Sequence, residues 1–297
     1  MTAKRPAGWR VDLSLVAIAL IWGFTFVLVK QALDDISTLL FLTLRFIFAA
    51  LVLAVTFRAE IRKGDLPRSL RGGAIAGFFL FSGYILQTFG LKYTTPAKAG
   101  FLTGLYIPLV PLIGTLVYRK VPQTSELLGI VAAFVGMALL TIQGNALKIG
   151  GGDLLVVACA VVYAFHILVL GRFAPGSNVA VLTVAQIATG SLLGSATCWW
   201  VETPRVSWSP TVWTALAVTS LLATALAFYL QTWAQQFSSP TRTALIFSTE
   251  PLFAWLASFL LTGEVLSGRG VAGAALILAG ILLVELKPPG IGQHQWS

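Results

Sequence analysis

The sequence predicts an all-α polytopic membrane protein whose ten transmembrane helices form two five-helix repeats of inverted topology. Three observations support this class: the composition, the number of long apolar segments, and an internal repeat. Of the 297 residues, 57% are hydrophobic and only 10% are charged, and the mean hydropathy is +0.86. A soluble domain is typically about 25% charged and about 45–50% apolar. A water-soluble fold of this size could not bury that excess.

The charge and the cysteines exclude several other classes. A net charge of +9 would suit a nucleic-acid partner, but the basic residues are scattered over short connections without a basic stripe. Cys159 and Cys198 both lie in apolar segments, which argues against a disulfide scaffold. The two histidines, His166 and His294, have no second ligand at helical spacing. We therefore expect no nucleic acid, no metal and no cofactor.

Ten segments are long and apolar enough to cross a bilayer, which takes about 20 residues each. Charged residues or Pro and Gly separate them. The expected spans are 11–30, 36–57, 70–91, 97–118, 124–142, 152–171, 179–200, 210–230, 241–262 and 265–286. The connections leave no room for a soluble catalytic domain, and no phosphate-binding loop motif is present. If transport is driven, we expect the energy to come from a solute or ion gradient rather than from ATP hydrolysis on this chain.

The basic residues also indicate the orientation. With the N-terminus in the cytoplasm, thirteen Lys and Arg residues lie in inside segments and six in outside segments, while Arg45 lies within a span. Cytoplasmic connections of membrane proteins carry the excess of Lys and Arg. We therefore expect a multi-pass protein of the bacterial inner membrane with both termini in the cytoplasm.

The second half of the chain repeats the first at a shift of 144 residues. The register aligns Leu86-Gln87-Thr88 with Leu230-Gln231-Thr232, Pro96 with Pro240, Lys98 with Arg242, Gly129 with Gly273 and Gly136 with Gly280. The expected repeats cover residues 11–142 and 150–286. Because each holds five spans, an odd number, the two must enter the membrane in opposite directions. Inverted repeats place substrate near the bilayer midplane, between the repeats.

The chain also resembles the drug/metabolite transporter superfamily, specifically its EamA-type members. The residues that carry the likeness are Ile21-Trp22-Gly23, Phe26, Lys30, Arg45-Phe46, Glu250-Pro251, Gly263-Glu264, Gly273 and Gly280. One departure is Arg119-Lys120, where the family usually has Gly-Glu after the fourth span. The resemblance implies ten helices and the transport of small metabolites, amino acids or drugs. The expectation of export rests on this resemblance alone.

Ionisable side chains inside a span are costly and need an explanation. Arg45 is either a structural cation bonded to neighbouring helices or the partner of an anion, which would be Glu250 or a substrate carboxylate. Glu250 itself is either a substrate or proton site or part of a buried ion pair. His166 is either a hydrogen-bonded packing residue or a proton acceptor.

Prolines predict interruptions in two of the spans. Pro251 removes a backbone donor beside Glu250 and clashes with the carbonyl of Phe247. Pro108 and Pro111 act in the same way in the fourth span. Broken helices at corresponding positions of two repeats are the best sequence pointer to a transport site.

Polar and aromatic side chains complete the candidate site. Tyr84, Gln87 and Thr88 share one helix face, and Phe228, Gln231 and Thr232 repeat that spacing. The amides are either interhelical hydrogen-bonding groups or the wall of a central cavity. Trp22, Phe26, Tyr106 and Tyr163 could add an aromatic lining. The glycine pairs Gly73/Gly77, Gly100/Gly104 and Gly190/Gly194 are expected to let helices pack closely.

The predicted substrate-binding set is thus Trp22, Phe26, Tyr84, Gln87, Thr88, Tyr106, Tyr163, His166, Gln231 and Glu250. The expected function is transport of a small-molecule substrate, such as an amino acid, across the lipid bilayer by alternating access. The oligomeric state stays open. A lipid-modifying intramembrane enzyme is the alternative, but it needs an acid, base or nucleophile near an interface. A receptor or scaffold would leave the repeat unexplained.

Overall fold

The computed structural model describes residues 6–63, 66–119, 122–141, 150–262 and 267–285. Within these ranges the chain is helical, and the one β-type pairing is an isolated bridge between Ile36 and Val206. Seven helices in the described part of the chain are long and apolar enough to cross a membrane. Two shorter apolar helices, Thr124–Leu139 and Gly268–Leu283, accompany them. The multi-pass, all-helical class is therefore correct.

The first half of the chain forms seven helices in these ranges. They are α1 (Gly8–Ala32), α2 (Thr38–Thr56), α3 (Arg58–Lys63), α4 (Leu66–Tyr93), α5 (Pro96–Thr103), α6 (Tyr106–Tyr118) and α7 (Thr124–Thr141). The second half supplies α8 (Gly151–Phe173), α9 (Val179–Val201), α10 (Pro210–Ser220), the π-helix η1 (Leu221–Leu226), α11 (Ala227–Ala234), α12 (Pro240–Phe247), α13 (Glu250–Thr262) and α14 (Gly268–Glu285). The sequence did not indicate α3 or η1.

Two of the expected spans are interrupted, as the prolines predict. The fourth breaks between α5 and α6, and the ninth breaks between α12 and α13. The second break comes directly after Phe247, the residue whose carbonyl Pro251 would meet in a continuous helix. Pro111 behaves differently, because α6 runs on through it. The prediction of an interruption at Pro111 is therefore wrong, and Pro108, close to the first break, accounts for it alone.

The bounds of three consecutive elements recur later in the chain at one constant spacing. The helices α5, α6 and α7 begin and end 144 residues before α12, α13 and α14, respectively. Both α5 and α12 start with Pro after a capping hydroxyl, on Thr95 and Ser239. A hydroxyl N-cap followed by Pro at the first helical position is a strong helix start.

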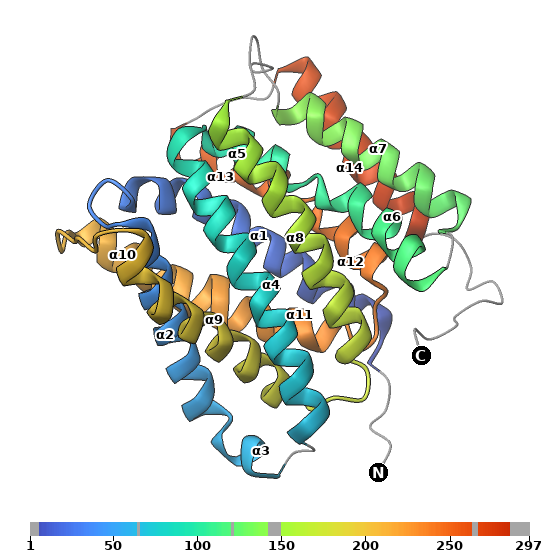
Figure 1. Ribbon diagram of the computed structural model, residues 1–297. Coiled ribbons are helices and arrows are strands. Elements are labelled where there is room, and N and C mark those ends of the chain that lie inside the picture. Colours follow the sequence, from blue (N-terminus) through green and yellow to red (C-terminus); the bar gives the residue numbers. More distant parts are fainter. Residues whose placement is uncertain (1–5, 64–65, 120–121, 142–149, 263–266, 286–297) are drawn as a thin grey trace.

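Glycines allow close contact between α7 and α14, which lie side by side along one edge of the molecule (Figure 1). A Cβ added to Gly136 would stand 2.5 Å from the carbonyl oxygen of Gly273. One added to Gly280 would stand 2.5 Å from the carbonyl oxygen of Gly129. The helix backbones therefore touch at both positions, which only glycine permits.

The glycine pairs proposed for packing behave as expected with one exception. Gly73 and Gly77 of α4 meet the backbone of α9, while Gly190 and Gly194 of α9 meet side chains of α2. Gly104 contacts Met137. Gly100 has no atom within 4 Å of its added Cβ, so its assignment to packing is wrong.

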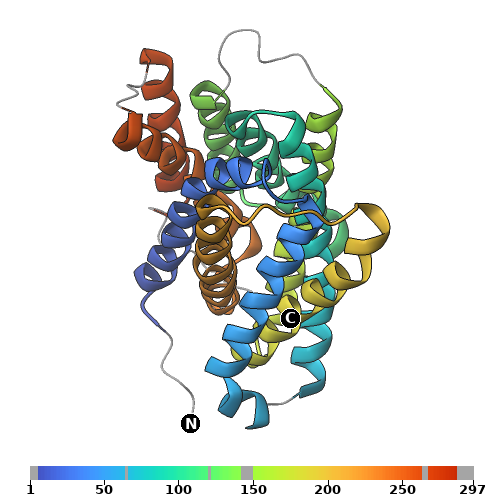
Figure 2. The same ribbon diagram turned by 90° about the vertical axis from the view of Figure 1, so that its left-hand side faces the viewer.

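The connection between α9 and α10 ties the second half of the chain to the first. Its extended segment crosses the α1–α2 connection (Figure 2). The Ser37 amide donates to the Arg205 carbonyl at 2.9 Å, and the Ser207 amide donates to the Asp35 carbonyl at 2.7 Å. These bonds satisfy backbone groups at the end of the bundle where no helix continues.

Candidate functional site

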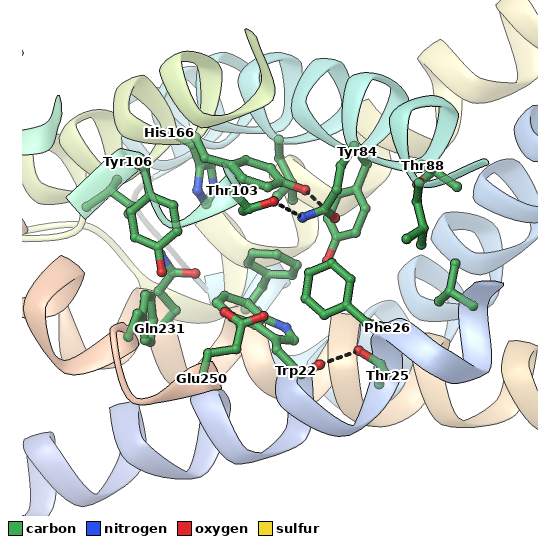
Figure 3. A pocket seen from close by; sticks show the side chains of 18 of the residues that line it. Trp22, Thr25, Phe26, Tyr84, Thr88, Thr103, Tyr106, His166, Gln231 and Glu250 are labelled. Atoms are coloured by element: carbon green, nitrogen blue, oxygen red, sulfur yellow. Dashed lines mark hydrogen bonds between the residues drawn. The ribbon is translucent and has the colours of Figure 1, made fainter. Parts of the chain in front are cut away.

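A cavity lies among α1, α2, α4, α5, α6, α8, α11, α12 and α13 (Figure 3). It holds about 700 Å³ of space between atoms, part of which is open to solvent. Side chains from both halves of the chain line it: Trp22, Thr25, Phe26, Val29, Arg45, Leu80, Tyr84, Gln87, Thr88, Leu91, Thr103, Tyr106, Tyr163, His166, Ile167, Phe228, Gln231, Phe247 and Glu250.

All ten residues predicted to bind substrate stand in this lining, and so does Arg45. Their contact with a substrate stays a prediction. Pro108, Pro111 and Pro251 are outside the lining and act on the helix backbone. Gly263, Glu264 and His294 lie outside the described residues.

Arg45 is buried, with 3% of its surface exposed, and neutral groups hold its guanidinium. Its Nε donates to Thr224 Oγ1 at 2.7 Å, and its Nη2 donates to the Tyr84 hydroxyl at 2.8 Å and to the Ala223 carbonyl at 3.3 Å. These bonds join α2 to α4 and η1. No ion pair between Arg45 and Glu250 forms among the described residues, so that pairing is wrong. The three bonds agree with a structural role for Arg45, and its contact with a substrate carboxylate stays a prediction.

The π-helix explains how Arg45 and Trp22 share one backbone acceptor. The Ala223 carbonyl accepts the Arg45 guanidinium and, at 3.0 Å, the Trp22 indole Nε1. A π-helical turn shifts the backbone hydrogen-bond pattern and is frequent at functional sites. Here it turns a membrane-buried carbonyl toward side chains of α1 and α2.

Glu250 is the first residue of α13, at the break after α12. Figure 3 shows its carboxylate pointing toward the middle of the group of labelled side chains. The α1 backbone fixes its position, because a Cβ on Gly23 would stand 2.8 Å from the Glu250 carbonyl oxygen. Among the described residues the carboxylate has no hydrogen-bond or ion-pair partner. The hypothesis that Glu250 belongs to a buried ion pair therefore fails.

His166 is hydrogen-bonded within the protein. Its Nε2 lies 3.1 Å from Gln186 Oε1, and Gln186 Nε2 donates to Thr232 Oγ1 at 3.3 Å. Since the Gln186 amide nitrogen is committed to Thr232, its oxygen accepts from His166, which selects the Nε2–H tautomer. This bond is what the packing hypothesis for His166 predicts.

The two repeat-related amides differ in their surroundings. Gln87 is engaged at both ends: its Nε2 donates to Thr103 Oγ1 at 3.1 Å, and its Oε1 accepts from the Tyr163 hydroxyl at 3.4 Å. Gln231 Nε2 donates to Gln235 Oε1 at 3.1 Å, while the buried Gln231 Oε1 lacks a partner among the described residues. Thr232 lies outside the lining and donates to the Phe228 carbonyl at 2.7 Å.

Aromatic rings form much of the wall. The Trp22 ring lies 5.0 Å from that of Phe247 and 5.6 Å from that of Phe228, centroid to centroid. Tyr84 lies 5.8 Å from Tyr163, edge to face. Such pairs stabilise one another beyond the burial of their area. They present a rigid apolar surface around the polar groups.

Eight lining residues were absent from the predicted set: Thr25, Val29, Leu80, Leu91, Thr103, Ile167, Phe228 and Phe247. The sequence positions of two of them could have identified them as lining residues. Phe228 precedes Gln231 at helical spacing, and Phe247 is the last residue before the predicted interruption. The apolar residues among them look like any other membrane-helix residue in the sequence.

A bundle of apolar helices around a cavity with polar and aromatic walls has the architecture of a membrane transporter. The chain matches the model of the EamA-like transporter family over residues 9–142 and 150–286, and it belongs to that family. A protein of Archaeoglobus fulgidus described as an uncharacterized transporter is 35% identical over 276 residues, 93% of this chain and 86% of that protein. The uncharacterized transporter YyaM of Bacillus subtilis is 25% identical over 92% of both chains.

A solved crystal structure has the same fold. It is 19% identical in sequence and aligns with a TM-score of 0.78 over 94% of this chain and 97% of the other. The family and its named relatives point away from an enzyme. Among the described residues, no group of three or more His, Cys, Asp and Glu side chains could hold a metal ion.

The contacts predict opposite effects for the two charges. Arg45→Gln should lower the free energy of unfolding by about 1–3 kcal/mol, because it removes hydrogen bonds from a buried charged group and leaves their acceptors unsatisfied. Glu250→Gln should leave it unchanged or raise it, because an unpaired carboxylate in low dielectric is unfavourable. Thermal unfolding of the purified variants in detergent measures both. A strongly destabilised Glu250→Gln protein would show that the carboxylate is paired.

Proposed function

We propose that this chain carries small organic solutes, such as amino acids or related metabolites, across the membrane by alternating access to the cavity. We further propose that it has ten spans, in two inverted repeats covering residues 11–142 and 150–286. The observation that carries the proposal is a cavity whose polar lining comes from both halves of the chain. Broken helices in both halves meet at this cavity, as they do at transport sites.

The repeated helix bounds support the inverted repeats. Besides the constant spacing of 144 residues, the contacts between α7 and α14 are reciprocal. Gly136 packs on Gly273, and their counterparts at that spacing, Gly280 and Gly129, pack on each other in the reverse roles. Reciprocal contacts of this kind are what a two-fold axis between the repeats produces.

Two ion pairs link the proposed repeats in the same reciprocal way. Lys98 of α5 pairs with Asp153 near the start of α8, Nζ to Oδ2, at 2.5 Å. Arg242 of α12, 144 residues after Lys98, pairs with Asp12 near the start of α1, Nη2 to Oδ2, at 2.8 Å. In Figure 1, α5 lies at the upper end of the bundle, whereas α1 begins at the lower end.

These pairs suit an alternating-access mechanism. Each joins a broken helix of one proposed repeat to the first helix of the other, and the helix ends that they join lie at opposite ends of the bundle (Figure 1). Opening the cavity to one side requires the helices on that side to separate, so one pair must break while the other holds. The Arg242–Asp12 pair is partly exposed on both sides. Such a pair contributes only about 0–1 kcal/mol, which lets it break during a transport cycle.

The proposed direction is export, and that preference rests on the family resemblance. The proposed location is the bacterial inner membrane with both termini in the cytoplasm, supported by the excess of Lys and Arg in the inside segments. The lipid-modifying enzyme is not favoured, because the cavity groups form no acid–base–nucleophile set and the relatives are named transporters.

The orientation predicts the sidedness of labelling. In a variant with Cys159 and Cys198 replaced by serine, a membrane-impermeant thiol reagent added outside whole cells should label Asp34→Cys. Glu60→Cys should react only in inverted vesicles. Both positions are exposed, so whether the reagent reaches the thiol depends only on the side of the membrane to which it is added. The reverse pattern would contradict the orientation.

The proposed mechanism predicts the outcome of a charge exchange. Asp12→Arg places two cations next to each other, which should destabilise the state closed on that side by about 1 kcal/mol. Flux of radiolabelled amino acids into liposomes should therefore fall about fivefold or more. Asp12→Arg/Arg242→Asp should restore most of the flux. Glu126→Gln is the matched control and should transport normally, because the Glu126 carboxylate accepts from the Gln123 amide and belongs to neither ion pair.

Two results would contradict this account. Wild-type flux in the single Asp12→Arg variant would show that the pair has no part in the cycle. The absence of flux for every solute tested, from a folded wild-type protein in liposomes, would contradict transport itself.

A further inference from the structure

The cavity contains hydrogen-bond acceptors that the protein leaves unsatisfied. One is the carboxylate of Glu250, which has no partner among the described residues. The second is the oxygen of Gln231, a side chain only 1% exposed. A buried polar group without a partner is costly, so the Gln231 oxygen calls for an explanation. Glu250 is half-buried and lines the same cavity.

The orientation of the Gln231 amide follows from its neighbours. Gln235 Nε2 donates to the Ile167 carbonyl at 2.9 Å, which fixes the Gln235 amide and turns its oxygen toward Gln231. Gln231 must therefore present its own nitrogen to that oxygen, at 3.1 Å. Its oxygen is the end left over, and Gln231 belongs to the cavity lining.

Several nitrogen donors that line the cavity are already engaged within the protein. The Gln87 nitrogen is engaged by Thr103, and His166 Nε2 is engaged by Gln186. Arg45 is 3% exposed and already donates to three acceptors, with its Cζ 4.4 Å from the centroid of the Tyr84 ring. Its charge is therefore dispersed over groups of the protein.

The aromatic wall favours a cation over a neutral donor. Trp22, Tyr106 and Phe247 line the cavity together with Glu250. Aromatic faces attract an ammonium group, Trp most strongly. A carboxylate in low dielectric is stabilised by an opposite charge, which a neutral hydroxyl or amide cannot supply.

We infer that the substrate class is protonated organic amines with an apolar body, and that the ammonium is the recognised end, held by Glu250 and the Gln231 oxygen. Amino acids belong to this class, but their carboxylate is dispensable. The inference rests on the proposed function only in treating the cavity as the substrate site. It narrows that proposal to a chemical class.

Matched probes test the inference on the purified full chain. Phenylalanine, phenethylamine (which lacks the carboxylate) and 3-phenylpropionate (which lacks the amine) share one apolar body. Calorimetric titration in detergent should show binding of the first two. Binding of 3-phenylpropionate should be at least about 30-fold weaker, because no ammonium meets the carboxylate.

Two variants assign the effect to the cavity. Glu250→Gln keeps the shape of the side chain and should weaken phenethylamine binding about 30-fold or more. Glu202→Gln is the matched control, because Glu202 lies outside the lining and accepts from the Leu39 amide and pairs with Lys92. It should bind phenethylamine like the wild type.

Three results with the wild-type protein would overturn the inference: 3-phenylpropionate binds as well as phenethylamine, phenylalanine binds and phenethylamine does not, or none of the three binds. Normal binding of phenethylamine by the Glu250→Gln variant would overturn it as well. Flux of radiolabelled phenylalanine into liposomes separates this from the proposed function. Amine binding without flux would support the site and contradict transport. If the wild-type protein transports phenylalanine but the Glu250→Gln variant binds phenethylamine with unchanged affinity, transport is supported and the role of Glu250 in amine binding is contradicted.

Discussion

The need to satisfy every backbone polar group away from water governs this structure. An interrupted helix inside a membrane is tolerated only where the freed groups are buried in protein or line a cavity. Here two interruptions, before Tyr106 and before Glu250, face the same cavity. Each of these residues begins the second part of its broken helix, and each side chain joins the lining. The breaks near Pro108 and Pro251 thus also bring Tyr106 and Glu250 to the cavity.

The network around Arg45 has a complementary role. A buried guanidinium needs several acceptors, and this one finds them on α4 and η1, including a carbonyl that the π-helix makes available. The Trp22 indole bonds to the same carbonyl. Helices from both halves are therefore held at one wall of the cavity. At the opposite charge, Glu250, the protein provides no partner among the described residues, which leaves that carboxylate available to a ligand.

Much of the site could be predicted because unusual residues stand out in apolar helices. Arg45 and Glu250 were conspicuous as charges within spans, and the shift of 144 residues singled out Gln87 and Gln231. The pairing of these groups could not be predicted. Whether Arg45 reaches Glu250 or Thr224 depends on helix rotation and on a π-helix that no local pattern announced. The different environments of Gln87 and Gln231, one satisfied and one not, likewise depend on packing against Thr103, Tyr163 and Gln235. Gly100 was misread because spacing alone does not show which face of a helix meets a neighbour.

Access to the cavity from the two sides of the membrane is the most direct measure of the central claim. Thr103 lines the cavity and is 4% exposed, so Thr103→Cys, with Cys159 and Cys198 replaced by serine, places one thiol there. In right-side-out and inverted vesicles alike, a membrane-impermeant thiol reagent should label this residue, and phenethylamine should slow the labelling from both sides. Labelling from one side only, under every condition tested, would contradict alternating access.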